Sequence, residues 1–252
     1  MTKIRIDALG GGVLLLTLAD PAKRNAMGFE MSRELVALFA TLRADGDTSA
    51  LVVTGEGAAF CAGADLPEMF GETDRPTSAT HARLHSYYQV FLAVLELPFP
   101  TIAAVNGPAV GAGLNLSLAC DLRIAGPNAM FGATFARIGL HPGGGCTWFL
   151  VRALGASRAL RTLLLGEEID ADRAVAWGLA DGPEDDCLTA ATDLAARIAA
   201  LDPALARSIK RTVRLAADTG DLGAVLEYET WAQAASAASS PLLQAWVDRF
   251  RP

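Results

Sequence analysis

The sequence has no excess of basic residues, no paired cysteines and few histidines. Its 21 Lys and Arg stand against 28 Asp and Glu, a formal net charge of −7 that disfavours a nucleic-acid backbone as the main partner. Its four cysteines, Cys61, Cys120, Cys146 and Cys187, lie far apart without a CxxC pair, so a disulfide framework is not expected. Hydrophobic residues make up 52% of the chain and charged residues 19%, which excludes a disordered polypeptide.

No uninterrupted hydrophobic run is long enough to suggest a membrane span. The uncharged stretch from Leu97 to Cys120 is broken by prolines, glycines and asparagines, which predict buried strand, turn and helix instead. The first residues, MTKIRIDALGGG, contain neither the apolar region nor the cleavage site of a signal peptide. We therefore expect a soluble, cytoplasmic protein.

Short apolar runs alternate with helical periodicity before the chain becomes helical throughout. From about Cys187 onward the pattern predicts helix, with breaks at Pro203, Gly220–Gly223 and Pro241. This order predicts an α/β core over residues 1–190 and a helical C-terminal region over residues 191–252. The expected strands are 4–8, 13–18, 50–54, 101–105 and 122–125, and the expected helices are 27–44, 84–95, 111–122, 147–165 with a break at Gly155, and 169–177.

Two glycine-rich turns each follow a predicted strand and open a predicted helix. They are FCAGADL, residues 60–66, and NGPAVGAG, residues 106–113. Small residues let a ligand approach the backbone, and a helix N-terminus directs unpaired N–H groups toward negative charge. Two such turns facing each other would form an oxyanion hole for a thioester carbonyl. Close packing of the chain is the alternative interpretation of both turns.

The amino-acid sequence of these segments resembles that of a known family. VVTGEGAAFCAGADL, followed by FPTIAAVNGPAVGAGLNLSLACDLRIA, is similar to the motifs of the enoyl-CoA hydratase/isomerase (crotonase) superfamily. PAKRNAM near residue 21 and LLLGEEIDADRAVAWGLAD near residue 163 extend the resemblance over essentially the whole chain in the correct order.

The resemblance implies a fold and a ligand. The fold would be a crotonase-type spiral of ββα turns whose C-terminal helical region forms homotrimers or homohexamers. Backbone N–H groups of Ala64 and Ala112 would form the oxyanion hole, and coenzyme A would enter as part of the substrate, with no further cofactor. The residues expected to contact the acyl-CoA are Lys23, Arg24, Ala62, Ala64, Asp65, Leu66 and Ala112.

The sequence departs from the family at both catalytic glutamates. The family motif GGG-x-E corresponds to GAGLN here, which places Asn115 at the first glutamate. The motif FG-x-PE corresponds to FGATF, which places Phe135 at the second. Each acid or base group contributes about 10²–10⁴-fold to a rate, so their absence disfavours standard hydration.

Two other residues, His141 and Tyr88, are candidates to replace the missing glutamates. His141, in the loop after Phe135, has a suitable pKa for acid–base work, and a structural histidine bonded to the loop backbone is the alternative. Tyr88 lies on the helix that resembles the one carrying a catalytic histidine in 4-chlorobenzoyl-CoA dehalogenases. The nucleophilic aspartate of those enzymes would fall at Gly143, so the sequence does not support dehalogenation by that route. A place in the core or in the lining of an acyl pocket is the simpler interpretation of this tyrosine. His81 and His85 have ligand spacing but no third ligand, so no metal is expected.

Two functional hypotheses follow from these residues. The first is an enzyme, a lyase or isomerase of fatty acid metabolism, that holds an acyl-CoA in a backbone oxyanion hole and uses His141 in a reaction other than standard hydration. The second is a non-catalytic acyl-CoA binding or carrier protein. An enzyme predicts a titratable side chain near the acyl α- or β-carbon, whereas a binding protein predicts none.

Overall fold

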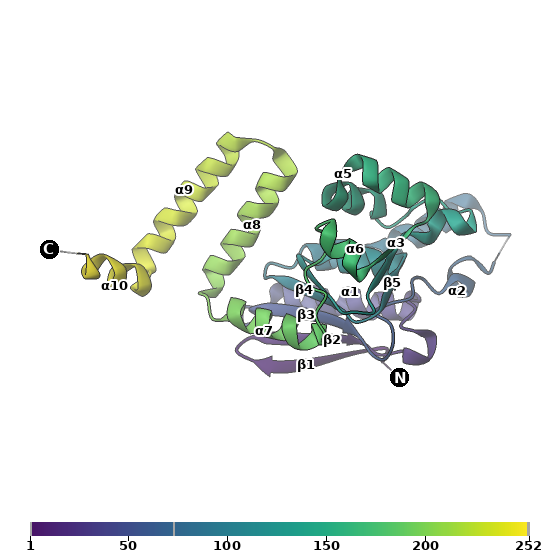
Figure 1. Ribbon diagram of the computed structural model, residues 1–252, viewed down its shortest axis with the longest axis horizontal. Helices are drawn as coiled ribbons and strands as arrows, with labels where there is room; N and C mark the ends of the chain where they lie inside the picture. The colour runs from purple at the N-terminus through teal and green to yellow at the C-terminus, as the bar shows by residue number, and fades with distance from the viewer. Residues whose placement is uncertain (1, 73, 251–252) are drawn as a thin grey trace. The chain divides into compact units, whose positions relative to one another are not determined.

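The computed structural model describes residues 2–72 and 74–250 and divides the chain into two compact units, Met1–Ala200 and Leu201–Pro252. Figure 1 traces both units from the N-terminal strands to the C-terminal helices.

A five-stranded sheet organises the first unit, in the order β1-β2-β3-β4-β6. The first two strands form an antiparallel hairpin, with Ile4 opposite Leu18. The other neighbours run parallel, which fits the continuous apolar runs of the central strands. The strands are β1 Ile4–Gly10, β2 Val13–Leu18, β3 Ala50–Gly55, β4 Thr101–Val105 and β6 Leu122–Ala125, so all five predicted strands are confirmed.

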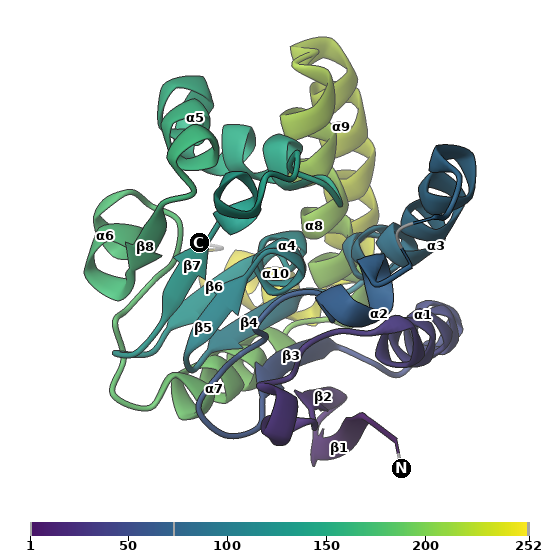
Figure 2. The ribbon, with the colours of Figure 1, turned by 90° about the vertical axis from the view of Figure 1, so that its right-hand side faces the viewer.

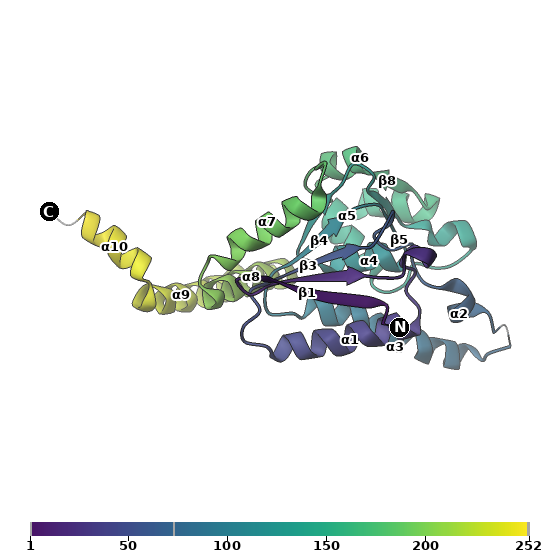
Figure 3. The same cartoon turned by 90° about the horizontal axis from the view of Figure 1, so that it is seen from below.

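The two faces of this sheet are covered by different helices. Successive residues of a strand point to opposite faces, so Leu51 and Val53 of β3 enter the main core while Ala50 and Val52 enter a smaller cluster. The main core contains residues of α1 (Phe29–Ala44), α3 (Thr77–Leu95) and α4 (Ala112–Ala119), and the smaller cluster contains residues of α7 (Cys187–Ala199). Figure 3 shows α7 and α1 on opposite sides of the strands.

The boundary of the first unit falls at Ala200, later than the predicted boundary at residue 190. Cys187, Ala191 and Ala195 of α7 are buried against β3, β4 and β6. These small side chains let the helix lie close to the sheet, so α7 is part of the α/β core rather than of the C-terminal region.

A second, three-stranded sheet was not predicted. Its order is β5-β7-β8, with β5 Pro108–Val110 parallel to β7 Met130–Gly132 and β8 Glu168–Asp170 antiparallel to β7. The prediction that Ile169 begins a helix was wrong, because Ile169 pairs with Phe131 and α6 starts only at Ala171 (α6 Ala171–Ala176). Strands of three residues are too short to show an alternating pattern. In Figure 2, β7, β8 and α6 lie next to one another on the left side of the view.

The remaining helices of the unit follow the predicted periodicity with shifted ends. Helix α1 starts at Phe29 rather than at residue 27. Met27 instead forms a parallel β-bridge with Ala64 and donates its N–H to the Gly63 carbonyl at 2.7 Å. Helix α3 starts seven residues before the predicted residue 84. Helix α5, Cys146–Leu165, is broken at Gly155, where φ is 76°, as expected. The other helical segments are η1 Pro21–Lys23, α2 Leu66–Phe70 and η2 Thr134–Ile138.

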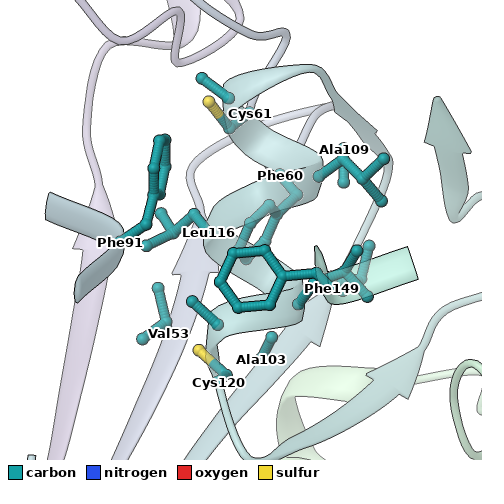
Figure 4. Packing of buried hydrophobic residues seen from close by; sticks show 14 of the residues in the cluster. Val53, Phe60, Cys61, Phe91, Ala103, Ala109, Leu116, Cys120 and Phe149 are labelled. Carbon is teal, nitrogen blue, oxygen red and sulfur yellow. The ribbon is translucent and has the colours of Figure 1, made fainter. Parts of the chain in front are cut away.

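Helix α4 is buried at all eight of its positions. Its Leu116 belongs to the same apolar cluster as Phe60, Phe91 and Phe149, which come from three other parts of the chain (Figure 4). A helix enclosed on every side has little freedom to rotate or shift, so its N-terminus is held in a fixed position.

The C-terminal unit consists of three helices with apolar side chains left exposed. They are α8 Pro203–Thr219, α9 Leu222–Ser239 and α10 Pro241–Arg249, capped by Asp202, Asp221 and Ser240. The exposed apolar residues include Leu205, Ile209, Val213, Leu222, Leu226, Trp231, Leu242, Trp246 and Phe250. Within the described residues, no helix has the length and hydropathy needed to cross a membrane.

Candidate functional site

The candidate site is a cavity of about 290 Å³ in the first unit, lined by residues of the two glycine-rich turns, α2, α3, η2 and the loop that follows η2. Of the predicted site residues, Lys23, Arg24 and Asp65 do not line it. Those that do are Ala62, Ala64, Leu66, Ala112, Asn115, Phe135 and His141. Residues that are distant in the sequence therefore converge on one cavity.

The two glycine-rich turns run side by side along one wall. Cys61 and Ala109 pair in parallel register: the Cys61 N–H donates to the Pro108 carbonyl and the Val110 N–H donates to the Cys61 carbonyl, both at 3.0 Å. Three residues beyond this pair, each segment reaches a cavity residue, Ala64 on the first and Ala112 on the second. A Cβ on Gly113 would overlap the Cys61 carbonyl, so glycine is what allows the turns to approach so closely.

Ala64 and Ala112 each carry a backbone N–H without an acceptor among the described residues. Ala112 is the first residue of α4, where no preceding helical turn supplies a carbonyl. The same helix end carries the positive pole of the helix dipole. One cavity wall therefore presents two unused donors and a partial positive charge.

Asn115 and Phe135, the positions at which glutamates were expected from the resemblance, both face this cavity. Asn115 is 1% exposed and donates from Nδ2 to the Gly143 carbonyl at 2.8 Å, and its Oδ1 has no partner among the described residues. Phe135 is half-buried, with its Cζ toward Gly111. Neither side chain ionises, and no carboxylate, lysine or arginine lines the cavity in the described part of the chain.

His141 is the one histidine among the described residues that line the cavity. It is exposed, and its Nδ1 lies 2.8 Å from the Pro142 carbonyl. A carbonyl only accepts, so Nδ1 carries the hydrogen and Nε2 is the ring nitrogen left to accept a proton. The loop-bonded geometry expected of a structural histidine is therefore present, and one ring nitrogen remains available.

Tyr88 of α3 faces the same loop. A Cβ on Gly143 would overlap the Tyr88 hydroxyl oxygen, so the tyrosine occupies the space that a side chain at position 143 would need. Burial raises the pKa of Tyr88, which keeps the hydroxyl neutral. Tyr88 lines the cavity, as predicted.

The charged residues near the first turn bind one another. The Lys23 Nζ lies 2.7 Å from Asp65 Oδ2, and this hydrogen bond raises the pKa of Lys23 and lowers the pKa of Asp65. Asp65 also caps α2 by accepting from the Glu68 N–H at 3.3 Å. The Arg24 carbonyl accepts from Ala62 N–H at 2.9 Å, so the two basic residues flank the turn without lining the cavity.

Two other groups of candidate residues play no part in the cavity. The four cysteines are free and buried, and burial raises the pKa of Cys61 to about 11 and of Cys146 to about 12, so neither is a reactive thiolate. His81 and His85 stack with ring centroids 6.2 Å apart. In the portion of the chain that the structure describes, no group of three potential metal ligands occurs.

Comparison with known proteins decides the family. The family model described as enoyl-CoA hydratase/isomerase matches residues 9–240. The chain belongs to this family. A probable enoyl-CoA hydratase of Mycobacterium tuberculosis is 50% identical over 210 residues, which cover 83% of this chain and 81% of that protein. The 2,3-dehydroadipyl-CoA hydratase of Escherichia coli is 39% identical and covers 80% of this chain and 78% of its own.

Solved structures of hydratases share the fold of this family member. The enoyl-CoA hydratase from Bacillus anthracis superposes with a TM-score of 0.89 at 30% identity, over 99% of this chain and 98% of that one. The 1,2-epoxyphenylacetyl-CoA isomerase of Escherichia coli is 33% identical over 86% of this chain and 84% of its own length. The resemblance in the sequence motifs is thus confirmed at the level of family and fold.

One cluster of this hydratase/isomerase family member was not predicted from the sequence. Asn115, Gly143 and the Tyr88 hydroxyl meet at the cavity wall, although they come from α4, a loop and α3. The signal available was the run Gly143-Gly144-Gly145, because successive glycines mark a backbone that other groups approach closely. Its partners could not be identified without the fold.

Proposed function

We propose that the chain binds an acyl-CoA thioester with the carbonyl oxygen accepting hydrogen bonds from the backbone N–H groups of Ala64 and Ala112. The observation that carries this proposal is the pair of unused donors at matched positions of two adjoining turns, both in one cavity. Such donors stabilise the negative charge that develops on a thioester oxygen when an enolate forms. Relatives named as a dehydroadipyl-CoA hydratase and an epoxyphenylacetyl-CoA isomerase support a coenzyme A thioester as ligand.

Coenzyme A would enter as part of this substrate, with no separate cofactor. Lys23 and Arg24 are exposed beside the first turn, where a lysine ammonium and an arginine guanidinium would face the CoA phosphates. Asp65 holds the Lys23 ammonium next to the turn through their 2.7 Å ion pair. The cavity itself is uncharged, which suits an acyl group.

Standard hydration of a 2-enoyl-CoA is not the activity that this cavity favours. Asn115 and Phe135 accept no proton, and His141 is the one histidine among the described residues of the cavity. A reaction needing one acid–base group, served by Nε2 of His141, is compatible with the geometry. No carboxylate lines the cavity among the described residues, which favours a second candidate, a non-catalytic acyl-CoA binding or carrier protein.

A proline substitution tests the oxyanion contact directly. Proline is tolerated at the first position of a helix and has no N–H, so Ala112→Pro removes one donor while leaving α4 formed. We expect butyryl-CoA to lose its affinity advantage over free CoA in this variant, measured by calorimetry, whereas Ala112→Gly retains it. An unchanged preference for butyryl-CoA in Ala112→Pro would refute the contact.

Turnover separates the two candidate functions. Crotonyl-CoA hydration is measured in the wild type, in His141→Ala and in the double variant Asn115→Glu/Phe135→Glu. Loss of turnover in His141→Ala with affinity intact would exclude the pure binding function. Tight binding without turnover, followed by activity in the double variant, would support it. Fast wild-type hydration independent of His141 would contradict the importance of the two missing carboxylates.

The oligomer and its location are part of the same proposal. We infer a homotrimer or homohexamer assembled through the C-terminal unit, because α8, α9 and α10 expose apolar side chains that a monomer would leave in water. We also propose that the protein is cytoplasmic.

A further inference from the structure

A second apolar chamber of about 320 Å³, open to solvent beside the exposed side chains of Leu92 and Trp148, adjoins the cavity. It lies between α3 and the start of α5, and Leu92, Leu95, Trp148 and Phe149 supply its apolar lining. Its polar rim, His85 and Gln89, belongs to α3 and is joined by the hydrogen bond from Gln89 Nε2 to the His85 carbonyl. No charged side chain lines this chamber among the described residues.

The partition between the two chambers is one layer of side chains thick. Tyr88 and Phe91 of α3 line both chambers, with ring centroids 6.3 Å apart. On the facing loop, Gly143 lines the first chamber and its neighbour Gly144 lines the second. Two aromatic rings against two glycines thus separate spaces of nearly equal volume.

The two rings of the partition are held differently. Phe91 is 1% exposed and lies against Gly144, where a Cβ would come within 2.7 Å of its Cε2. Tyr88 is half-buried, and no group in the described residues hydrogen-bonds to its hydroxyl. Phe91 is therefore a fixed part of the core, and Tyr88 is the side chain whose size decides whether the chambers communicate.

We propose that Tyr88 sets the upper size limit of the acyl group by closing the first chamber against the second. This inference rests on the proposed acyl-CoA function. The first chamber, at about 290 Å³, lies at the lower end of the roughly 300–1,000 Å³ usual for ligand pockets, and removal of the tyrosine ring would roughly double the connected space. The second chamber is apolar, so its occupant in a Tyr88 variant is the distal part of a longer saturated acyl chain.

The wild-type protein provides the first test. Affinities are measured by calorimetry for acetyl-, butyryl-, hexanoyl-, octanoyl-, decanoyl- and dodecanoyl-CoA. While methylenes enter the first chamber, affinity should rise by up to about fourfold for each one buried. Beyond the length that fills this chamber, affinity should stop rising or fall. A steady rise to dodecanoyl-CoA would overturn the proposal without any variant.

Three substitutions of Tyr88, and one of Leu92, test the role of the ring. In Tyr88→Ala and in the less disruptive Tyr88→Leu, affinity should continue to rise past the wild-type limit, by tenfold or more at dodecanoyl-CoA. Tyr88→Phe keeps the ring and loses a hydroxyl without a partner, so it should keep the wild-type length limit. Leu92→Trp, at an exposed position that lines the second chamber alone, should cancel the gain when combined with Tyr88→Leu.

The outcomes distinguish this inference from the proposed function. If no acyl-CoA binds better than free CoA, the acyl-CoA function itself fails. If short acyl-CoA thioesters bind and the length limit is the same in Tyr88→Leu as in the wild type, the function stands and the role of Tyr88 is refuted. Circular dichroism of each variant confirms that it is folded before affinities are compared.

Discussion

Replacing Asn115 by glutamate tests how the buried site shifts the pKa of a carboxyl group. Its Nδ2 donates to the Gly143 carbonyl at 2.8 Å in a position that is 1% exposed. In Asn115→Glu, the new carboxyl can keep this hydrogen bond only while protonated, because an ionised carboxylate has no hydrogen to donate to a carbonyl. Burial disfavours the ionised form as well, so both effects raise the pKa of the new group.

The sign and size of the effect follow from linkage. A carboxyl whose pKa rises by about two units on folding, from roughly 4.3, makes the folded protein bind more protons than the unfolded chain between the two values. Stability therefore falls as the pH rises, by about 2.7 kcal/mol in total, of which roughly 1.7 kcal/mol falls between pH 5 and pH 8. For a domain of this size that corresponds to about 3–7 °C in melting temperature.

The assay is thermal unfolding of the wild type, Asn115→Glu and Asn115→Gln at pH 5 and pH 8, at one protein concentration. Asn115→Gln keeps an amide donor and stays neutral, so its difference from the wild type should be the same at both pH values. The difference for Asn115→Glu should widen at pH 8. A difference that is constant, or larger at pH 5, would refute the reasoning about this buried hydrogen bond.

Three further predictions concern stability and assembly. Asp65→Ala loses the α2 cap, worth about 1 kcal/mol, together with the exposed pair to Lys23, whereas Asp65→Asn loses the pair alone. Because the pKa of Asp65 is lowered, the advantage of the wild type over Asp65→Asn in thermal unfolding should vanish as the pH falls through that pKa, whereas the advantage over Asp65→Ala should shrink to the contribution of the cap. Gly143→Ala should cost about 1–3 kcal/mol in urea unfolding through overlap with Tyr88, and Tyr88→Phe should recover part of it, whereas strict additivity would contradict the contact. Trp246→Asp, on the exposed face of α10, should convert the proposed oligomer to a smaller species in light scattering, and an identical mass for both proteins would exclude this surface from assembly.

The parts of the fold that could be predicted from the sequence are those governed by local patterns. The five strands of the larger sheet were found because each is a continuous or alternating apolar run ended by a turn residue. The break at Gly155 and the start of α8 at Pro203 could be predicted because glycine and proline determine the backbone conformation at their own positions. The family resemblance supplied the placement of Ala64 and Ala112 in one cavity.

The parts that could not be predicted depend on contacts between distant segments. Three-residue strands such as Met130–Gly132 exist because neighbouring backbone supplies hydrogen-bond partners, and that information is absent from a short window. The assignment of α7 to the first unit depends on which sheet face receives Ala191. The meeting of Tyr88 with Gly143 likewise joins residues that only the folded chain brings together.

The two N–H donors of the cavity belong to the backbone, and this has a consequence for how the site can change over evolutionary time. A point mutation replaces a side chain, and only a proline at Ala64 or Ala112 would delete a donor. The side chains around them, including Asn115 and Phe135, can be exchanged while the donors stay where the buried α4 helix and its neighbouring turn hold them. During evolution the catalytic side chains can thus be lost or replaced while the two N–H donors that bind the ligand are retained. A new reaction then needs only a few substitutions in a binding site that is already formed.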